Sequence, residues 1–159
     1  MFAARESYGA ENCSVKRALD IVGEKWTLLV LREAFYGARR FEQFQAHVGC
    51  ARNLLSERLN TLVDAGVMHR VPYQETGQRE RHEYRLTDKG LDLLPAVVAL
   101  MRWGDRWEAD AAGPPVEIIH RECGNPVELV LRCSHDHVPL TARDTQPRPG
   151  PGARPVVQA

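Results

Sequence analysis

Apolar residues recur at intervals of three and four positions in three short segments near the start of the chain. The segments run from Val15 to Val22, from Lys25 to Tyr36 and from Phe41 to Val48. This spacing places the apolar side chains on one face of a helix. Each segment is followed by a residue that commonly ends helices: Gly23, Gly37 and Gly49. We therefore predict three short amphipathic helices, the last two joined by an extended link at Arg39 and Arg40.

A fourth helical pattern, from about Ala51 to Ala65, has two contrasting faces. Its apolar positions predict a face turned to a core, and Gly66 marks its end. The opposite face carries planar or multi-donor side chains, which are able to read the edges of base pairs. The apolar set is Leu55, Leu59, Leu62 and Val63, and the polar set is Arg52, Asn53, Ser56, Glu57 and Asn60.

The pattern then changes to the alternation typical of strands. Val67 to Tyr73 and His82 to Leu86 alternate, and the polar stretch between them contains Gly77. We predict an antiparallel hairpin, with Arg79 and Arg81 near its tip.

Thr87 is a good N-cap for a long helix over Asp88–Trp107, which Pro95 should kink. Two apolar stripes run along it, whereas packing on one core needs only one stripe. We therefore expect the second stripe to pack against a partner. The first stripe is Leu91, Leu94, Val98 and Met101 and continues to the polar Asp105; the second is Leu93, Val97, Leu100 and Trp103.

The two ends of the chain lack strong periodicity. We predict a flexible arm over residues 1–12 and a small β-hairpin extension over 113–144, with strands at 116–120 and 127–131. Residues 145–159 are rich in Pro and Gly and are expected to be disordered.

Composition narrows the class of protein. The chain has 159 residues, of which 43% are hydrophobic and 26% are charged. These values are typical of a soluble single-domain protein. Its apolar runs fall short of the ~20 residues of a membrane span, and no secretory signal opens the chain, so we expect a cytoplasmic protein. The motifs of nucleotide-binding loops, nucleophile elbows and zinc peptidases are absent from the sequence, so we do not expect an enzyme.

Charge alone does not identify a partner. Basic and acidic residues number 21 each, but residues 14–90 carry 13 basic and 10 acidic side chains. The mild positive excess of this middle segment permits a surface for DNA without requiring one.

The order of the predicted elements is that of a winged helix-turn-helix, and several motifs resemble those of HxlR-type bacterial transcriptional regulators, relatives of the MarR group. The resemblance implies a mainly α protein with a small β-wing (α+β), N- and C-terminal dimerisation helices, and a DNA-binding domain over 13–112. It implies a homodimeric repressor or activator. The motifs are Cys13–Arg32, Arg40–Phe44, Asn53–Leu59, Ala65–Met68 and Tyr84–Gly90.

The predicted DNA contacts follow from that geometry. A recognition helix and a wing dock on double-stranded DNA, and two copies fit a pseudo-palindromic operator. Base contacts are predicted for Arg52, Asn53, Ser56 and Glu57, and phosphate or minor-groove contacts for Arg40, Arg79 and Arg81. Arg58 reaches phosphate or pairs with a neighbouring acid. The alternative is a winged-helix protein-interaction module without DNA binding.

The subunit interface is expected to combine the helix over 15–22 with the helix over 88–107. Trp103 and Trp107, about one turn apart, are the predicted aromatic anchors. The full predicted set is Leu19, Val98, Met101, Trp103 and Trp107.

Two cysteines of the predicted DNA-binding domain receive different interpretations. Cys13 precedes a helix N-terminus and lies beside Lys16 and Arg17, which favours thiolate. The resemblance implies a redox or electrophile sensor at this place, and the alternative is a small residue buried at the dimer seam. Cys50 is predicted to pack in the core. The small-molecule effector, if there is one, is unknown.

The remaining two cysteines belong to a loose His/Cys cluster on the predicted C-terminal hairpin. A zinc-ribbon-like site there would use His120, Cys123, Cys133 and one of His135, Asp136 or His137. The alternative is a pair of cysteines bracketing a hairpin without metal, so that the protein needs no cofactor.

Overall fold

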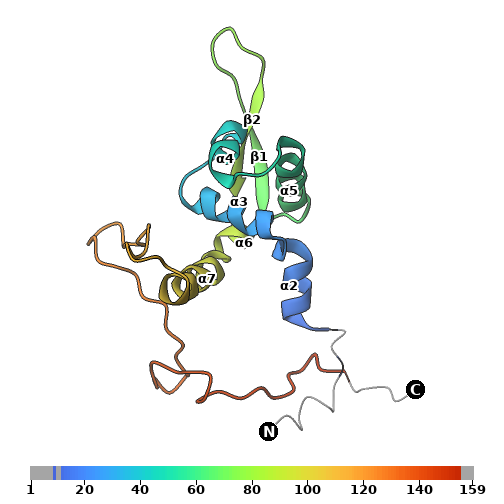
Figure 1. The fold of residues 1–159 in the computed structure, drawn as a ribbon. Helices are drawn as coiled ribbons and strands as arrows, with labels where there is room; N and C mark the ends of the chain where they lie inside the picture. Colours follow the sequence, from blue (N-terminus) through green and yellow to red (C-terminus); the bar gives the residue numbers. More distant parts are fainter. Residues whose placement is uncertain (1–8, 10–11, 155–159) are drawn as a thin grey trace. The chain divides into compact units, whose positions relative to one another are not determined.

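The computed structural model describes Gly9 and residues 12–154 of the chain. Residues 18–109 form one compact unit, and residues 110–154 form another together with the described residues up to Arg17. The predicted arm over 1–12 therefore lies largely outside the described residues. The first unit contains the elements that the sequence assigns to a winged helix-turn-helix (Figure 1).

In the described part of the chain, four helices form ahead of the hairpin where the apolar spacing predicts them. They are α2 (Ser14–Val22), α3 (Lys25–Phe35), α4 (Phe41–Val48) and α5 (Arg52–Asp64). The Gln43 side chain accepts hydrogen bonds from the backbone N–H groups of Arg39 and Arg40, both at 2.8 Å. These bonds cap the start of α4. Gly49 ends α4 with a φ of 78°. This is the left-handed conformation, which glycine adopts freely.

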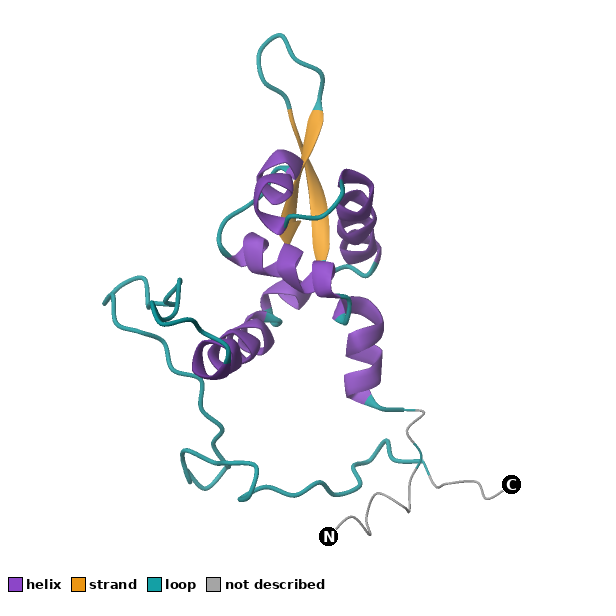
Figure 2. Ribbon diagram, in the orientation of Figure 1, coloured by secondary structure: helices purple, strands orange, loops and turns teal. Residues whose placement is uncertain are grey.

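Two strands, β1 (Met68–Tyr73) and β2 (Arg81–Leu86), form the predicted antiparallel hairpin. Met68 pairs with Leu86 at its base and Tyr73 with Arg81 at its outer end. The predicted link at Arg39 and Arg40 lies along the free edge of β2, where the Tyr84 N–H donates to the Arg39 carbonyl oxygen at 2.7 Å. In Figure 2 the hairpin extends past α4 and α5, which lie on either side of it.

The core of this unit lies where α3, α4 and α5 meet the base of the hairpin. Phe44, Leu55, Leu59 and Leu62 are fully buried, and Cys50 is buried as predicted. Phe44 packs edge-on against the Tyr84 ring, with centroids 6.3 Å apart. Burying three leucines of α5 fixes the rotation of that helix, and its polar face is therefore fixed toward solvent.

The long C-terminal helix is divided, which corrects the prediction of one kinked helix. A short helix, α6 (Asp88–Leu91), is capped by the Thr87 hydroxyl, and α7 (Leu94–Trp107) follows after a turn. Pro95 has no N–H and its ring conflicts with the carbonyl four residues earlier, at Leu91. That residue is where α6 ends, so the proline breaks the helix rather than bending it.

The C-terminal unit does not form the strands predicted over 116–120 and 127–131. Pairing there is limited to one antiparallel bridge between Ile119 and Pro126. No residue of 110–154 is buried. A two-stranded ribbon without a packing surface is marginally stable, which explains why the strands do not extend.

The Pro/Gly-rich segment, expected to be disordered, is described as far as Arg154 and forms neither helix nor strand there. Gly152 and Arg154 accept hydrogen bonds from Asn12 and Gly9. None of the helices in the described part of the chain has the length and apolar character needed to cross a membrane.

Candidate nucleic-acid interface

The first two turns of α5 present the polar face that the sequence predicts to contact bases. Arg52 and Asn53 are exposed and Ser56 is half-buried, while Leu55 on the opposite side is fully buried. Together with Phe41 of α4, these three polar residues line a shallow surface hollow. The predicted residues Arg52, Asn53 and Ser56 are therefore brought together on one surface.

Arg52 is supported from below by an aromatic ring. Its guanidinium lies over the Phe41 ring, 4.5 Å from the centroid. A cation above an aromatic face is attracted by the negative face of the ring, and the contact restricts the rotamers of the arginine. The sequence analysis did not assign this role to Phe41, whose apolar spacing indicated only a core residue.

The pair Glu57 and Arg58 differs from the rest of the predicted surface. Their side chains form an ion pair at 2.6 Å, and the Arg58 side chain is only 17% exposed. A guanidinium held in this way is poorly placed to reach a phosphate. Of the two predicted roles of Arg58, the structure supports pairing with a neighbouring acid, whereas Glu57 keeps an exposed carboxylate.

Arg40 is predicted to contact phosphate or the minor groove. In the structure its side chain contacts other residues at the base of the wing. It donates to Glu75 at 2.6 Å, lies 3.5 Å from Glu83 and lies over the Tyr73 ring at 4.3 Å from the centroid. The hydrogen bond with Glu75 is the main cause that raises the pKa of Arg40 above its ordinary value. This residue therefore ties the wing to the start of α4, while its side chain stays 40% exposed and its contact with phosphate or the minor groove remains a prediction.

Glu83 is the acidic centre of this cluster. Hydrogen bonds from Arg85 first and Arg40 second hold the pKa of the Glu83 carboxyl below its usual range. Arg85 lies 2.9 Å from the Glu83 carboxylate. A cluster of paired cations and carboxylates therefore lies where the wing joins the domain.

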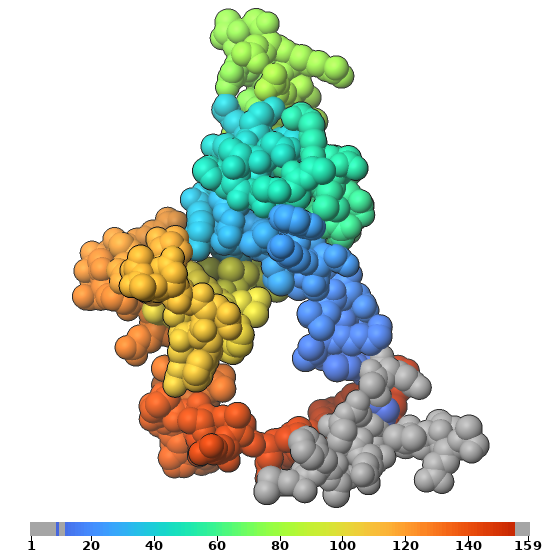
Figure 3. Space-filling model, viewed as in Figure 1, coloured from blue at the N-terminus to red at the C-terminus, as the bar shows by residue number. Residues whose placement is uncertain are grey.

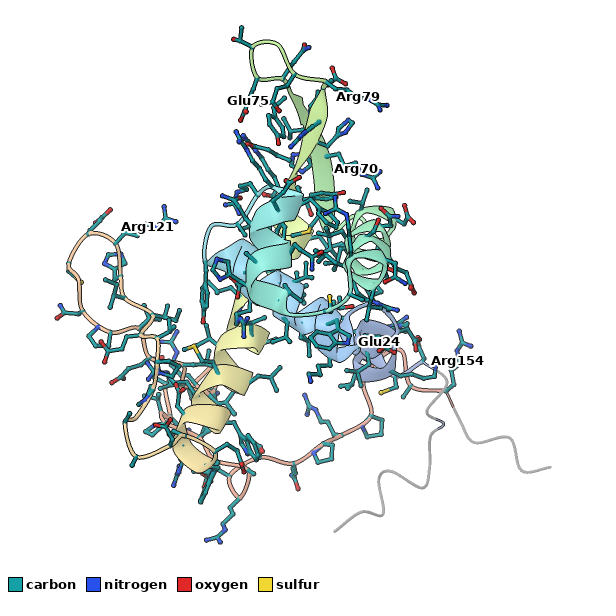
Figure 4. All side chains as sticks on the ribbon, turned by 45° about the horizontal axis from the view of Figure 1, so that its top comes forward. Glu24, Arg70, Glu75, Arg79, Arg121 and Arg154 are labelled. Atoms are coloured by element: carbon teal, nitrogen blue, oxygen red, sulfur yellow. The ribbon has the colours of Figure 1, made fainter. Side chains whose placement is uncertain are left out.

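The two predicted arginines of the wing differ in their contacts with acidic side chains. Arg79 is exposed in the loop between the strands, where Figure 4 shows it extending from the tip. Arg81, also exposed, lies 3.5 Å from Glu42 of α4. Arg81, Arg52 and Tyr73 contribute to a hollow of about 350 Å³ between α4, α5 and the wing. In the space-filling view the wing loop protrudes beyond these helices (Figure 3).

Arg70 is a cation of this surface that sequence analysis missed. It is exposed on β1 and donates to the Asn60 side chain of α5 at 2.6 Å. The alternating pattern of β1 indicates only that Arg70 faces solvent. Its contact with Asn60 could not be predicted, because it depends on how α5 packs beside the hairpin. The contact connects the recognition face to the wing.

The predicted dimer residues divide into two groups. Leu19 of α2 and Trp103 and Trp107 of α7 are each more than half exposed. Val98 is only 5% exposed, and Met101 accepts a hydrogen bond from the Tyr36 hydroxyl at 3.7 Å, so both face their own chain. The predicted second stripe is divided, because Leu93 and Val97 pack against the core of their own chain. The exposed outer stripe of α7 consists of Leu100, Trp103 and Trp107.

Cys13 and the Cys/His residues of the C-terminal unit lie outside this surface. Cys13 immediately precedes α2 and is half-buried. The predicted zinc-ribbon residues form two separate pairs, His120 with Cys123 and Cys133 with His137. Within the described residues, no three such donors gather into a preformed metal site.

Comparison with known proteins identifies the family. The sequence model of the HxlR-like helix-turn-helix family matches residues 21–112. This chain belongs to that family. It is also 49% identical over 146 residues to the uncharacterized HTH-type transcriptional regulator Rv3095 of Mycobacterium tuberculosis, covering 92% of this chain and 91% of the relative.

Two solved structures of bacterial regulatory proteins have a similar fold. The crystal structure of the transcription-factor candidate PA1607 matches with a TM-score of 0.74 at 41% identity, over 86% of this chain and 94% of that one. The oxidized form of the redox regulator HypR matches with a TM-score of 0.56 at 28% identity, over 62% of this chain and all of the other. Membership of the HxlR-like family makes this chain a helix-turn-helix transcriptional regulator and not an enzyme.

Proposed function

We propose that the protein is a homodimeric, sequence-specific repressor that binds a pseudo-palindromic operator in the cytoplasm. The observation that carries the proposal is the surface formed by Arg52, Asn53 and Ser56, on a helix whose opposite face is buried. Such a helix enters the major groove with its N-terminal residues at the base edges, while the wing contacts the backbone.

The charges of the surface support this function over a protein-interaction module. Arg52 and Arg79 are exposed on α5 and in the wing loop, whereas Arg81 is paired with Glu42. The acids of the wing base are paired with Arg40 and Arg85. The chain as a whole has zero net charge. Exposed cations beside paired acids nevertheless leave a locally positive surface.

Dimerisation is supported by the apolar side chains that a single chain leaves in water. Leu100, Trp103 and Trp107 of α7 are 56%, 59% and 61% exposed, and they recur at helical spacing. A stripe of this kind is typical of a helix that packs against a partner. A second copy also supplies the second recognition helix that a palindrome needs.

The test is selection of binding sites from random duplexes, followed by salt titration of the selected site. We expect a two-fold symmetric consensus for the wild type. Arg79→Ala should weaken binding to all sequences and reduce the slope of log K against log salt by about one. Arg121→Ala is the matched control, since it removes an exposed arginine from the other unit. Failure to select any sequence over random duplex at physiological salt contradicts the proposal.

A second proposal concerns the signal: the Cys13 thiol senses oxidants or electrophiles. It is supported by the position of Cys13 before α2 and by the similarity to HypR, a redox regulator. That helix carries the exposed Leu19. An adduct or disulfide at Cys13 would alter the start of this helix.

Diamide titration of operator binding tests the signal separately. We expect wild type and Cys50→Ser to lose operator binding at the same diamide concentration, and Cys13→Ser to keep it. Equal sensitivity of Cys13→Ser and wild type, or no sensitivity in either, contradicts the sensor role and leaves the DNA-binding proposal unaffected.

A further inference from the structure

Two turns in the C-terminal unit have the same arrangement of a backbone hydrogen bond around a cysteine. DNA binding by the winged unit does not account for this arrangement. In the first, the Val127 N–H donates to the Ile118 carbonyl oxygen and closes a loop around Cys123. In the second, the Leu140 N–H donates to the Leu131 carbonyl oxygen and closes a loop around Cys133. The chain therefore presents a cysteine at each of two hairpin-like turns.

Each turn also places a histidine nitrogen against its cysteine sulfur. The Nδ1 atom of His120 lies 3.3 Å from Sγ of Cys123, and the Nδ1 atom of His137 lies 3.2 Å from Sγ of Cys133. In a tetrahedral zinc site, bond lengths of about 2.0–2.1 Å to nitrogen and about 2.3 Å to sulfur separate those two atoms by about 3.6 Å. Each pair is therefore within a few tenths of an ångström of the spacing for two ligands on one ion.

Backbone and side-chain contacts select among the possible ligands of the second turn. The His135 N–H donates to Sγ of Cys133 at 3.3 Å. A bond of this kind supports and orients a metal-bound thiolate. Asp136 lies 3.4 Å from Arg132, so its carboxylate is directed to that cation. Of the three alternatives that the sequence left open, only His137 has its ring nitrogen against the Cys133 sulfur.

The unit that holds these turns has no core of its own. No residue of 110–154 is buried, and its apolar side chains Ile119, Val130, Leu131 and Val138 are each about half exposed or more. Small units that bury too little apolar surface are usually held together by a metal or by disulfides. This lack of buried apolar surface is independent of the pair distances, and a bound metal is one of the usual ways in which such a unit is stabilised.

We propose that one Zn²⁺ ion binds His120, Cys123, Cys133 and His137 and joins the two turns into a tetrahedral N₂S₂ site. No three donors of the described residues form a preformed site. Binding therefore brings the turns together and orders residues 116–140. The role is structural, since four protein ligands leave no open position on the ion.

Metal binding is measured on the full chain, purified in reductant, by equilibrium dialysis against Zn²⁺ and by the absorption of the Co²⁺-loaded protein. We expect one ion per chain with the spectrum of tetrahedral cobalt bound to thiolate. Cys123→Ser, Cys133→Ser and His137→Gln should each weaken Zn²⁺ binding about tenfold or more. His135→Gln and Cys50→Ser, the matched controls, should bind like the wild type.

Hydrogen exchange gives a structural measurement of the same proposal. At a Zn²⁺ concentration that saturates the wild type but not the weakened His137→Gln, Zn²⁺ should slow amide exchange over residues 116–140 in the wild type only. Two ions per chain, no ion at micromolar Zn²⁺, or equal losses in His135→Gln and His137→Gln would overturn the proposal. Operator binding by the variants shows that the winged unit is folded and separates this outcome from the proposed function.

Discussion

Arg52 combines an exposed guanidinium with an aromatic ring that holds it in place. Its guanidinium is exposed to solvent, and the Phe41 ring lies 4.5 Å below it. The planar fork of arginine donates two parallel hydrogen bonds to guanine, which the ammonium group of lysine does not reproduce in the same geometry. Position and residue type are therefore both expected to matter for base recognition.

We expect Arg52→Ala to weaken operator binding by about 1–3 kcal/mol and to relax the preference at one base position in each half-site. Arg52→Lys keeps the charge but should relax the same base position. The measurement is competition binding against single-base variants of the selected site. An unchanged base preference in both variants would show that Arg52 does not read a base.

Glu83 provides a prediction about pH. Arg85 and Arg40 lower the pKa of its carboxyl in the folded protein. The stabilisation is therefore present above the unfolded pKa of about 4.3 and is lost as the pH falls through the folded value. We expect the melting temperature to fall less steeply on acidification in Glu83→Gln than in the wild type, with Glu80→Gln as the control. Identical acid profiles for Glu83→Gln and wild type would contradict the stabilising role of the cluster.

Sequence patterns predicted the elements of the winged unit better than the partners of individual side chains. Apolar spacing determines the buried face of α5, because Leu55, Leu59 and Leu62 must share one side. It does not determine that Arg58 pairs with Glu57 or that Arg40 meets Glu75, since those contacts depend on side-chain rotamers and on how the wing bends.

The predicted element boundaries were wrong in two places where a local effect outweighed the apolar periodicity. The stripe pattern continued through Pro95, but α6 and α7 are separate helices. The missing N–H and the ring of the proline account for the division. In the C-terminal unit the weak alternation around Ile119 and Val127 predicted strands, but only one bridge formed. Strands without a surface to cover them are too weakly stabilised to extend.

Helix α7 offers a test of its two faces with matched substitutions. Trp103 is exposed and Val98 is buried, and both side chains are apolar. We expect Trp103→Glu to give a folded monomer, because it introduces charge only at the proposed dimer surface. Val98→Glu should unfold the domain, because it buries an unpaired charge.

The measurement is light-scattering mass together with circular dichroism at micromolar concentration. A wild-type mass near the 17.9 kDa of one chain, or a dimeric and fully folded Trp103→Glu protein, would contradict the assignment of this face.

The proposed dimer combines two copies of a DNA-reading surface whose position in each chain is fixed by packing. Buried leucines hold α5, the Arg40 cluster holds the wing, and the outer stripe of α7 is available to a partner. A dimer built in this way presents its recognition helices at one fixed separation. Binding should then depend on the distance between half-sites as strongly as on their sequence.

The most direct test is operator binding as a function of half-site spacing, measured with duplexes that carry the selected half-sites. Successive major grooves on one side of DNA lie about 10–10.5 base pairs apart. The account predicts two chains per duplex at the selected spacing and a large loss of affinity when about five base pairs, half a helical turn, are inserted. Equal affinity at both spacings, or one chain per duplex, would contradict it.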